Sequence, residues 1–500
     1  MFRVLTTFFT ATGLALALCL ALEAAAGDSI TRASLAPRDL ALRLLGYLLI
    51  LLFWFEFSWR PWLAALTCVI SVTALIVVSR AKRSVIGEPL LFSDFALLPQ
   101  VPRHPQLYYI PPLWHPRVSI PVLATLGATM LWYRTEPSVL PATTFPRVVA
   151  LLGLPLLLGL LAWAAPRPPL ARLITRWFPR PDLEADVARV GLPASLLGYT
   201  ARAFAGSEPV LAPPALPSGP GDDVVVVIQL ESFIDPERLG GPSLPVMELF
   251  RSRAAQYGRL QVPAHGAYTM RSEHAVLTGR PSETLGFGRY DPYTSRSGDE
   301  PTSLARLARG RGYDTLFLHP FHRDFFRRAQ VMEAFGFRDL VMEEAFAAAE
   351  RVGPYVGDVA LGERLLAEVG ARRAPLFLFC VTMENHGPWK PGRLPGIDDP
   401  QAQYMHHVVH TGRMVEAVAA GLERLAGERG QTMTLCVFGD HAPSLPACTP
   451  GFGGRTTDYA LFRFGRPMPP PRRLDITADA LGRELRGAIA TAPADNAAAT

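Results

Sequence analysis

The feature that most constrains this chain is a set of long apolar stretches that all lie before residue 166. A helix needs about 20 predominantly apolar residues to cross a bilayer, and five stretches approach that length. The sequence therefore predicts a membrane region of five transmembrane helices in residues 1–166. The expected spans are Val4–Ala26, Leu40–Phe57, Trp62–Ser79, Val118–Trp132 and Val148–Ala165.

The first stretch has some features of a signal peptide, because Arg3 precedes it and small residues close it at Ala24–Gly27. The further apolar stretches favour an uncleaved first helix. With the N-terminus inside, the loops would carry four basic residues inside and seven outside, against the positive-inside rule. An odd number of spans predicts that the two ends of the membrane region lie on opposite sides.

Composition, charge and cysteine spacing argue against an ordinary soluble protein, a nucleic-acid partner and a thiolate zinc site. Only 19% of residues are charged, against about 25% in ordinary soluble domains, because the first part of the chain is so apolar. The net charge of +5 does not indicate a nucleic-acid partner, since the basic residues are spread out and form no stripe with aromatics. The five cysteines include no CxxC pair, so a thiolate zinc site is not predicted.

The chain changes character after the last apolar stretch. Ala171–Phe178 mixes apolar side chains with Arg172 and Arg176 and is typical of a helix lying on a membrane surface. Leu211–Gly221 has four prolines and two glycines and is typical of a linker. The expected divisions are a membrane region 1–166, a surface segment and linker 167–222, a catalytic domain 223–466 and a tail 467–500.

The second half alternates between two patterns. Continuous apolar runs, typical of strands buried on both faces of a parallel sheet, occur at Val224–Leu230, Tyr313–Leu318, Leu376–Val381 and Met433–Phe438. Helical patterns occur at Ser272–Thr278, Phe325–Phe335, Leu361–Val369 and Met405–Leu425. This alternation predicts a doubly wound α/β domain.

Polar side chains follow each predicted strand. Glu231 comes after the first, His319 after the second, His386 after the third, and Asp440 with His441 after the fourth. The carboxyl ends of parallel strands meet at one edge of a sheet, where such folds carry their chemistry. Two carboxylates and an imidazole form a donor set suited to Mn²⁺, Mg²⁺ or Zn²⁺.

Thr269 and Arg328 add a second kind of chemistry. Thr269 lies at a predicted helix N-terminus, where free N–H groups and the helix dipole favour an anion. A cation bound to the same hydroxyl would favour its deprotonation. With Arg328 and histidines nearby, the set is equipped to attack phosphorus. Glu273, at helical spacing from Thr269, either supports this set or caps the helix.

These residues resemble the lipoteichoic acid synthase group, which are membrane phosphoglycerol transferases of the alkaline phosphatase/sulfatase superfamily. The resemblance rests on Glu231-Ser-Phe, Thr269 before Ser272-Glu273, His386 and Gly439-Asp440-His441. It extends to the membrane spans and, more loosely, to Gly87–Asp94. It implies a membrane region followed by an α/β domain of alkaline phosphatase/sulfatase type.

Carried over to this sequence, the resemblance implies a role for each matching residue. Glu231, Thr269, Asp440 and His441 would bind one divalent metal ion, typically Mn²⁺. Thr269 would be the nucleophile that holds a glycerophosphoryl intermediate, and His319, Arg328 and His386 would hold the phosphoglycerol group. The implied partners are a membrane phospholipid donor, phosphatidylglycerol, and a glycan or glycolipid acceptor. The implied location is a bacterial inner membrane, with the catalytic domain facing the periplasm.

Three positions depart from that family, and rival functions share the superfamily. Phe326 replaces a substrate-contacting Trp, and Met270-Arg271 replaces a small and an acidic residue, so the acceptor stays open. A sulfatase needs a Cys or Ser that is converted to formylglycine, and Thr269 cannot be converted to that aldehyde. A phosphoethanolamine transferase, or a phosphodiesterase or hydrolase of the superfamily, remains an alternative. The other histidines, His322, His406, His407 and His410, are expected to be solvated or locally packed.

Overall fold

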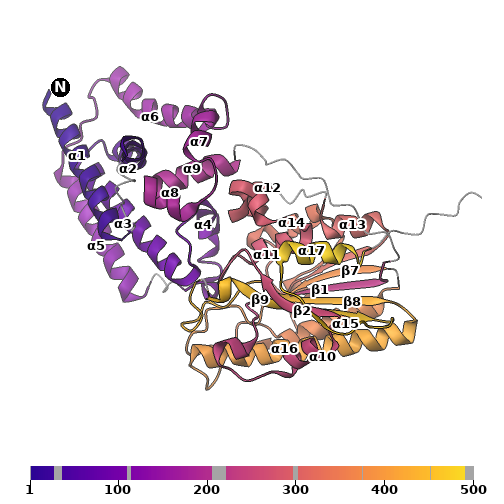
Figure 1. Cartoon of the computed structure of the whole chain (residues 1–500). Helices are drawn as coiled ribbons and strands as arrows, with labels where there is room; N and C mark the ends of the chain where they lie inside the picture. Colours follow the sequence, from indigo (N-terminus) through magenta and orange to yellow (C-terminus); the bar gives the residue numbers. More distant parts are fainter. Residues whose placement is uncertain are drawn as a thin grey trace, which may run out of the picture. The chain divides into compact units, whose positions relative to one another are not determined.

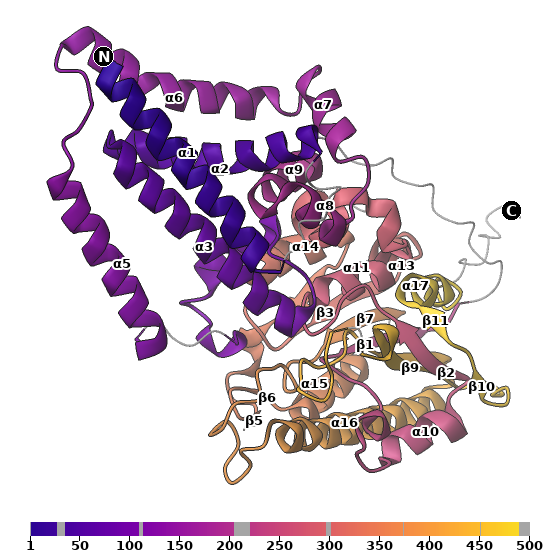
Figure 2. The same cartoon turned by 60° about the vertical axis from the view of Figure 1, so that its left-hand side comes forward.

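A computed structural model of the chain describes residues 2–27, 36–109, 114–204, 221–296, 302–373, 375–450 and 452–489. The chain divides into two compact units, drawn in Figures 1 and 2. The membrane unit comprises Met1–Pro99 and Tyr109–Ser207, and the catalytic unit comprises Gln100–Tyr108 and Glu208–Thr500.

Four helices of the membrane unit are long and apolar enough to cross a bilayer, as far as the described residues show. They are α1 (Phe2–Ala25), α2 (Pro37–Ser58), α3 (Pro61–Ile86) and α6 (Thr144–Ala164). Four of the five predicted spans are thereby confirmed as apolar helices. The remaining one is a helix of 20 residues, α5 (Pro116–Thr135), which is long enough but less apolar than the other four. Its crossing of the membrane stays a prediction.

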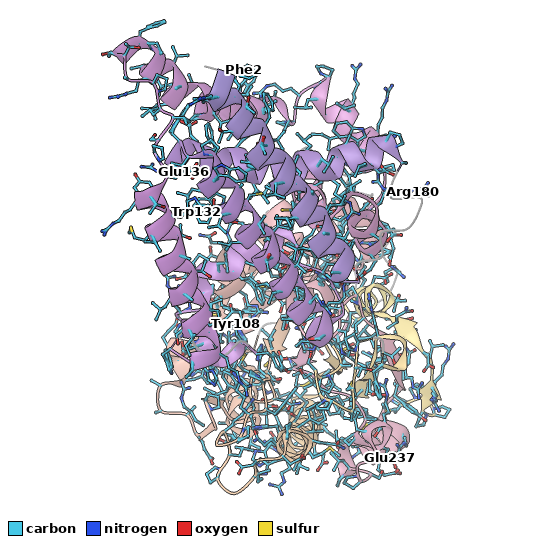
Figure 3. The ribbon with its side chains drawn as sticks, turned by 90° about the vertical axis from the view of Figure 1, so that its left-hand side faces the viewer. Phe2, Tyr108, Trp132, Glu136, Arg180 and Glu237 are labelled. Atoms are coloured by element: carbon cyan, nitrogen blue, oxygen red, sulfur yellow. The ribbon has the colours of Figure 1, made fainter. Side chains whose placement is uncertain are left out.

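The C-terminal end of α5 meets the beginning of α3. The Glu136 carboxylate accepts hydrogen bonds from the backbone N–H groups of Trp62 (3.0 Å) and Leu63 (2.8 Å). Trp132 Nε1 donates to the same carboxylate at 3.1 Å, and Figure 3 shows both residues at one end of α5. A carboxylate is stabilised there because the free N–H groups at a helix start carry partial positive charge.

Three short helices, α7 (Leu170–Trp177), α8 (Leu183–Val190) and α9 (Leu192–Phe204), follow the last span. The expected surface helix corresponds to α7, in which no residue is buried. In contrast, α9 is joined to the bundle, because Glu23 of α1 accepts from the Leu192 N–H and pairs with Arg43 of α2 at 2.6 Å. The predicted linker Leu211–Gly221 lies outside the described residues except for Gly221.

The catalytic unit is built on one mixed sheet with the strand order β10-β2-β9-β8-β1-β7-β3-β4, and β11 also pairs with β2. The five strands from β8 to β4 in that order are parallel, and β9 runs antiparallel to β8. Its strands are β1 (Val224–Leu230), β2 (Gln256–Gln261), β3 (Asp314–Leu318), β4 (Asp339–Val341), β7 (Leu376–Val381), β8 (Met433–Gly439), β9 (Thr456–Phe464), β10 (Arg472–Arg473) and β11 (Ile476–Thr477). All four predicted strands are confirmed, as is the α/β fold class.

Helices cover both faces of the sheet (Figure 1). One face carries α10 (Pro245–Arg253), α15 (Asp358–Ala371) and α16 (Pro400–Arg429), and the other carries α11 (Thr269–Thr278), α13 (Leu304–Gly310), α14 (Arg328–Phe335) and α17 (Ala478–Arg486). The smaller elements of this unit include α12 (Pro292–Arg296) and the hairpin of β5 (Arg351–Val352) and β6 (Tyr355–Val356), while the short helix α4 (Phe92–Leu97) belongs to the membrane unit. The central strands are fully buried, because each face packs against helices.

The residues after 466 differ from the expected tail. β10 and β11 pair with β2, and α17 packs against α11, burying Leu481, Leu485 and Ile489. This part of the chain up to residue 489 therefore belongs to the domain, because its apolar side chains complete a helical layer.

Candidate active site

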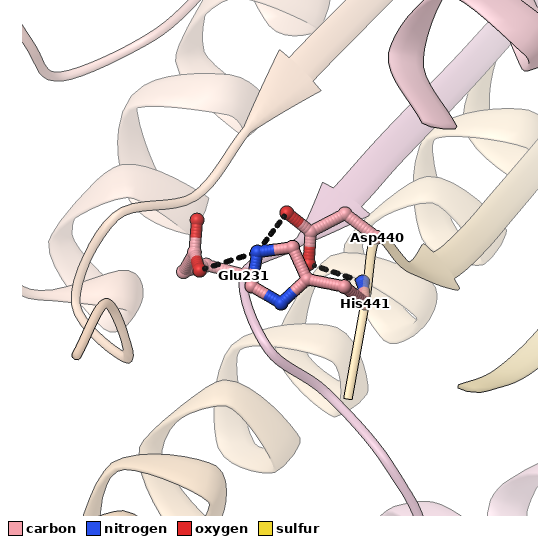
Figure 4. A group of neighbouring side chains, drawn as sticks. All are labelled: Glu231, Asp440 and His441. Carbon is pink, nitrogen blue, oxygen red and sulfur yellow. Dashed lines mark hydrogen bonds and ion pairs between the residues drawn. The ribbon is translucent and has the colours of Figure 1, made fainter. Parts of the chain in front are cut away.

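Three predicted ligand residues converge at the carboxyl edge of the sheet. Glu231 follows β1, and Asp440 and His441 follow β8; the two strands are paired in parallel with Leu230 opposite Gly439. Figure 4 shows the three side chains together, with ligand atoms that all lie within 4.8 Å of one another. His441 Nε2 is 3.5 Å from Glu231 Oε1 and 3.4 Å from Asp440 Oδ2.

The polar atoms of this cluster are arranged as a cation would require. Asp440 Oδ2 and His441 Nε2 are buried and have no hydrogen-bond partner among the described residues. His441 Nδ1 lies 3.2 Å from the carbonyl oxygen of Ala442. A carbonyl only accepts, so Nδ1 donates to it, and Nε2 is the ring nitrogen that faces the two carboxylates and is placed to bind a metal.

The electrostatics of the cluster also favour a bound cation. Burial, followed by the nearby Asp440 carboxylate, raises the pKa of Glu231 to about 7. Two buried carboxylates repel each other, and a divalent cation between them would remove that cost. The donor set therefore fits a divalent metal, as expected for the superfamily, while two oxygens and one nitrogen do not distinguish Mn²⁺ from Mg²⁺ or Zn²⁺.

Thr269 is the first residue of α11, beside the same edge. The preceding Tyr268 has a left-handed backbone with φ 63°, which turns the chain sharply into the helix. One turn later, Ser272 Oγ donates to the Asp440 carbonyl at 2.5 Å, so the first turn of α11 lies against Asp440. Thr269 is 7% exposed and lies at the helix start, where the N–H groups carry partial positive charge.

His319 and Arg328 form a second buried group. Arg328 Nη1 lies 2.8 Å from His319 Nε2, and His319 Nδ1 lies 3.1 Å from the Val381 carbonyl oxygen. His319 therefore donates through Nδ1 and accepts from Arg328 through Nε2. Burial, with the Arg328 charge, holds the pKa of His319 well below its usual value, so the ring is neutral. Arg327, in contrast, is exposed.

Glu273, whose role the sequence left open, is the counter-charge of Arg328. Its Oε2 accepts from Arg328 Nη2 at 2.9 Å, and Tyr293 Oη donates to its Oε1. Both charged groups are almost completely buried. This pair orients the guanidinium from behind, so Glu273 supports the site instead of capping the helix.

His386 follows β7, in the same electrostatic neighbourhood. Its Nδ1 lies 2.5 Å from the Gly387 carbonyl oxygen. Burial lowers the pKa of His386 to about 4, while the charges of Asp440 and Arg328 act on it in opposite directions. Asp440 belongs to the cluster with Glu231 and His441, and Arg328 belongs to the group with His319. His386 therefore interacts electrostatically with both groups.

Three further histidines of the catalytic unit form a separate group around Glu384. His407 and His410 lie with Nδ1 2.9 Å and 3.0 Å from Glu384 Oε1, and the His406 ring contacts His410 at 4.6 Å. They are locally packed, as expected. His265, which the sequence analysis did not single out, is also buried. Burial, followed by the nearby His441, lowers the pKa of His265 to about 4.

Comparison with known proteins adds the family. The sequence profile of the Sulfatase family matches residues 223–467. The capsular polysaccharide biosynthesis protein RkpI of Rhizobium meliloti is 30% identical over 424 residues, which is 81% of this chain and 78% of that protein. A protein of the same organism named for cyclic beta-1,2-glucan modification is 32% identical over 273 residues, 53% of this chain and 42% of its own length.

The similarity to solved structures is more distant. The phosphoglycerol transferase GacH of Streptococcus pyogenes, in complex with sn-glycerol-1-phosphate, is 18% identical with a TM-score of 0.43, covering 57% of this chain and 83% of that one. The lipoteichoic acid synthase LtaP of Listeria monocytogenes is also 18% identical, with a TM-score of 0.45 and 56% and 76% coverage. From the matched profile and the similarity to RkpI, this chain belongs to the sulfatase family, and its motifs resemble those of the lipoteichoic acid synthases.

Proposed function

We propose that the protein transfers a phosphoglycerol-type group from a membrane phospholipid, phosphatidylglycerol, to a hydroxyl of a cell-envelope glycan or glycolipid. The observation that carries the proposal is the buried Glu231–Asp440–His441 cluster beside the start of α11, where Thr269 lies. The names of two relatives, which refer to a capsular polysaccharide and a glucan, support a glycan acceptor.

The chain's own residues have distinct tasks in this reaction. Glu231, Asp440, His441 and Thr269 would hold one divalent metal, Mn²⁺ in the first instance, which would supply Lewis-acid neutralisation of charge. Arg328 would pair with the phosphoryl oxygens, since its guanidinium is held permanently charged by Glu273. The neutral His386 would contact the glycerol hydroxyls, and His319 would help to hold the group by orienting Arg328.

The transfer has two displacements at phosphorus. In the first, Thr269 Oγ forms a bond to phosphorus, the bond to the diacylglycerol oxygen breaks, and the proton from Thr269 ends on released diacylglycerol. In the second, an acceptor hydroxyl forms the new ester, the Thr269–phosphorus bond breaks, and the acceptor proton returns to Thr269. The first-turn N–H groups of α11 would stabilise the oxygens that gain charge.

Localisation follows the same proposal. The donor lipid and a cell-envelope acceptor meet at the outer face of a bacterial inner membrane. The catalytic unit would therefore face the periplasm, and the apolar helices would keep it close to its lipid.

Intact-mass analysis of the Mn²⁺-loaded full-length protein in detergent, after incubation with phosphatidylglycerol, tests this function. We expect a mass gain of one glycerophosphoryl group and release of diacylglycerol, both absent in Thr269→Ala. Thr278→Ala is the matched control, because Thr278 lies nine residues further along the same helix, where its hydroxyl donates to the His274 carbonyl oxygen.

The alternatives give different results in the same experiment. An adduct that forms only with phosphatidylethanolamine would make the protein a phosphoethanolamine transferase. Full turnover by Thr269→Ala would refute the covalent intermediate and favour direct hydrolysis, as in a phosphodiesterase.

A further inference from the structure

The segment Gln100–Tyr108, named here the strap, belongs to the catalytic unit although the chain on both sides of it belongs to the membrane unit. It lies between α3 and α5 in the sequence. Two short turns shape it, closed by hydrogen bonds from the His104 N–H to Gln100 O and from the Leu107 N–H to His104 O. The strap is therefore folded as a part of the catalytic unit.

The strap packs on a cluster of aromatic side chains. Leu107 is buried in a cluster with Phe321, Phe325, Tyr355 and Met383, against which Tyr108 also packs. Only 6% of Leu107 is exposed, because these rings enclose it.

Two polar contacts add to this packing. The His104 ring lies 4.5 Å from the His322 ring and 5.3 Å from that of Phe321. Lys390, four residues after His386, donates from Nζ to the Tyr108 carbonyl oxygen at 2.9 Å. The strap is therefore attached both to the loop after β3 and to the loop after β7.

The same aromatic rings contact the three residues expected to hold the phosphoglycerol group. The Phe321 ring lies 6.2 Å from that of His319, and the Tyr355 ring lies 6.0 Å from that of His386. Arg328 Cζ lies 5.8 Å from the centre of the Phe326 ring. Each of the three therefore has an aromatic neighbour that belongs to the cluster under the strap.

The backbone before Arg328 shows why these rings need support. Phe326 and Arg327 both have left-handed backbones, with φ 55° and 54°. Such conformations are costly for residues with a side chain and persist only where the surroundings impose them. The Phe326 ring packs on Phe325 at 4.4 Å, and Phe325 lies in the cluster with Leu107. Through the contact of Leu107 with the cluster that contains Phe325, the strap thus packs against the turn that begins α14.

We propose that the strap is a positioning element of the headgroup site, so that binding of a glycerol phosphate group requires this segment, which lies between α3 and α5 in the sequence. The proposal rests on the function proposed above, because it assumes that His319, Arg328 and His386 receive that group. The strap touches the rings and acts through them.

Binding of sn-glycerol phosphate, measured by calorimetry, tests the role of the strap in full-length, Mn²⁺-loaded Thr269→Ala protein in detergent. Adding Leu107→Ser should weaken binding about tenfold, since small displacements of a binding group have effects of that size or larger. Gln106→Ser is the matched control, because its exposed side chain precedes Leu107 in the same turn. Lys390→Met, which removes only the bond to Tyr108 O, should also weaken binding.

Photo-crosslinking tests the packing without any ligand. A benzophenone amino acid at Phe326 should crosslink to the tryptic peptide 104–117. Absence of this crosslink would overturn the proposal, as would equal affinity of Leu107→Ser and its Gln106→Ser control. If the crosslink forms but the parent protein binds no glycerol phosphate, the proposed function is wrong and the positioning role with it. If Leu107→Ser alone retains full affinity, only the role of the strap is wrong.

Discussion

At the scale of single residues, the Glu273–Arg328 pair is the part of the site with the clearest energetic consequence. Glu273→Gln would leave the Arg328 guanidinium buried without a counter-charge, which costs about 3–5 kcal/mol for a pair of this kind. We expect a lower melting temperature and weaker donor binding, seen as a raised KM for phosphatidylglycerol. Thermal unfolding and initial rates, compared with the exposed Glu283→Gln, measure both effects.

The same pair shows where sequence reasoning stops. Glu231, Asp440 and His441 were predicted because they follow buried apolar runs, and neighbouring parallel strands bring such residues together. Glu273 has no local signal of that kind. Its partner Arg328 is 55 positions away in the sequence and begins a different helix, so only the packing of α11 against α14 shows what Glu273 does.

Two neutral histidines, the buried His319 and the half-buried His386, predict how stability depends on pH. Burial holds the pKa of His319 well below its usual value and that of His386 at about 4. In the unfolded chain each ring would titrate near about 6.5, so the unfolded state binds more protons as the pH falls below that value. Stability contributed by these rings is present above about pH 6.5 and is lost as the pH falls towards 4.

We therefore expect the melting temperature to fall between pH 7 and pH 4.5, with a smaller fall in His386→Gln. Differential scanning calorimetry at constant ionic strength measures the slope. Equal slopes in the two proteins would contradict the assignment of a half-buried, neutral His386.

At the scale of helices and strands, the strands that are buried along their whole length are the ones that the sequence predicts, and the edge strands are not. β1, β3, β7 and β8 lie inside the sheet, and their apolar runs were recognised. β2 lies near the edge and alternates between buried and exposed positions around Gly258, with polar Gln256 and Arg259. β10 and β11 are two residues each and follow a proline-rich stretch, so nothing local distinguishes them from a tail.

The contact between α17 and α11 gives a testable consequence of that unexpected C-terminal helix. A Cβ added at Gly482 would lie 2.2 Å from the Val276 carbonyl oxygen and 3.0 Å from Gly279 Cα. Gly482→Ala must therefore push α17 away from the helix that carries Thr269. We expect a lower melting temperature, by several degrees, and a lower rate of adduct formation.

Gly427→Ala is the matched control for this substitution. Gly427 lies within α16, where an added Cβ would meet no atom within 4 Å. Alanine is preferred over glycine in a helix by up to about 1 kcal/mol, so this variant should be as stable as the parent or more so. Equal behaviour of the two variants would mean that α17 does not pack closely on α11.

At the scale of the whole molecule, the transfer requires the catalytic unit on the side where lipid headgroups and envelope glycans meet. The number of spans decides whether the two chain ends lie on the same side or on opposite sides of the membrane. The open case is α5. Its uncharged run Val118–Tyr133 is shorter than the about 20 residues of a typical span, but Arg117 and Arg134 flank it and can extend their side chains to the interfaces.

We expect α5 to cross the membrane, because its C-terminal end is tied through Glu136 to the start of α3, which is itself long and apolar enough to span. Five spans would put residue 2 inside and the catalytic unit outside.

The native cysteines are all buried, so Phe2→Cys and Arg424→Cys would each provide a single accessible thiol. In intact spheroplasts an impermeant maleimide should label Arg424→Cys, whose side chain is 65% exposed, and should label Phe2→Cys only after lysis. Labelling of both before lysis would reduce the spans to four and leave α5 on the surface, and protection of Arg424→Cys would place the catalytic unit inside the cell, where the proposed acceptor is absent.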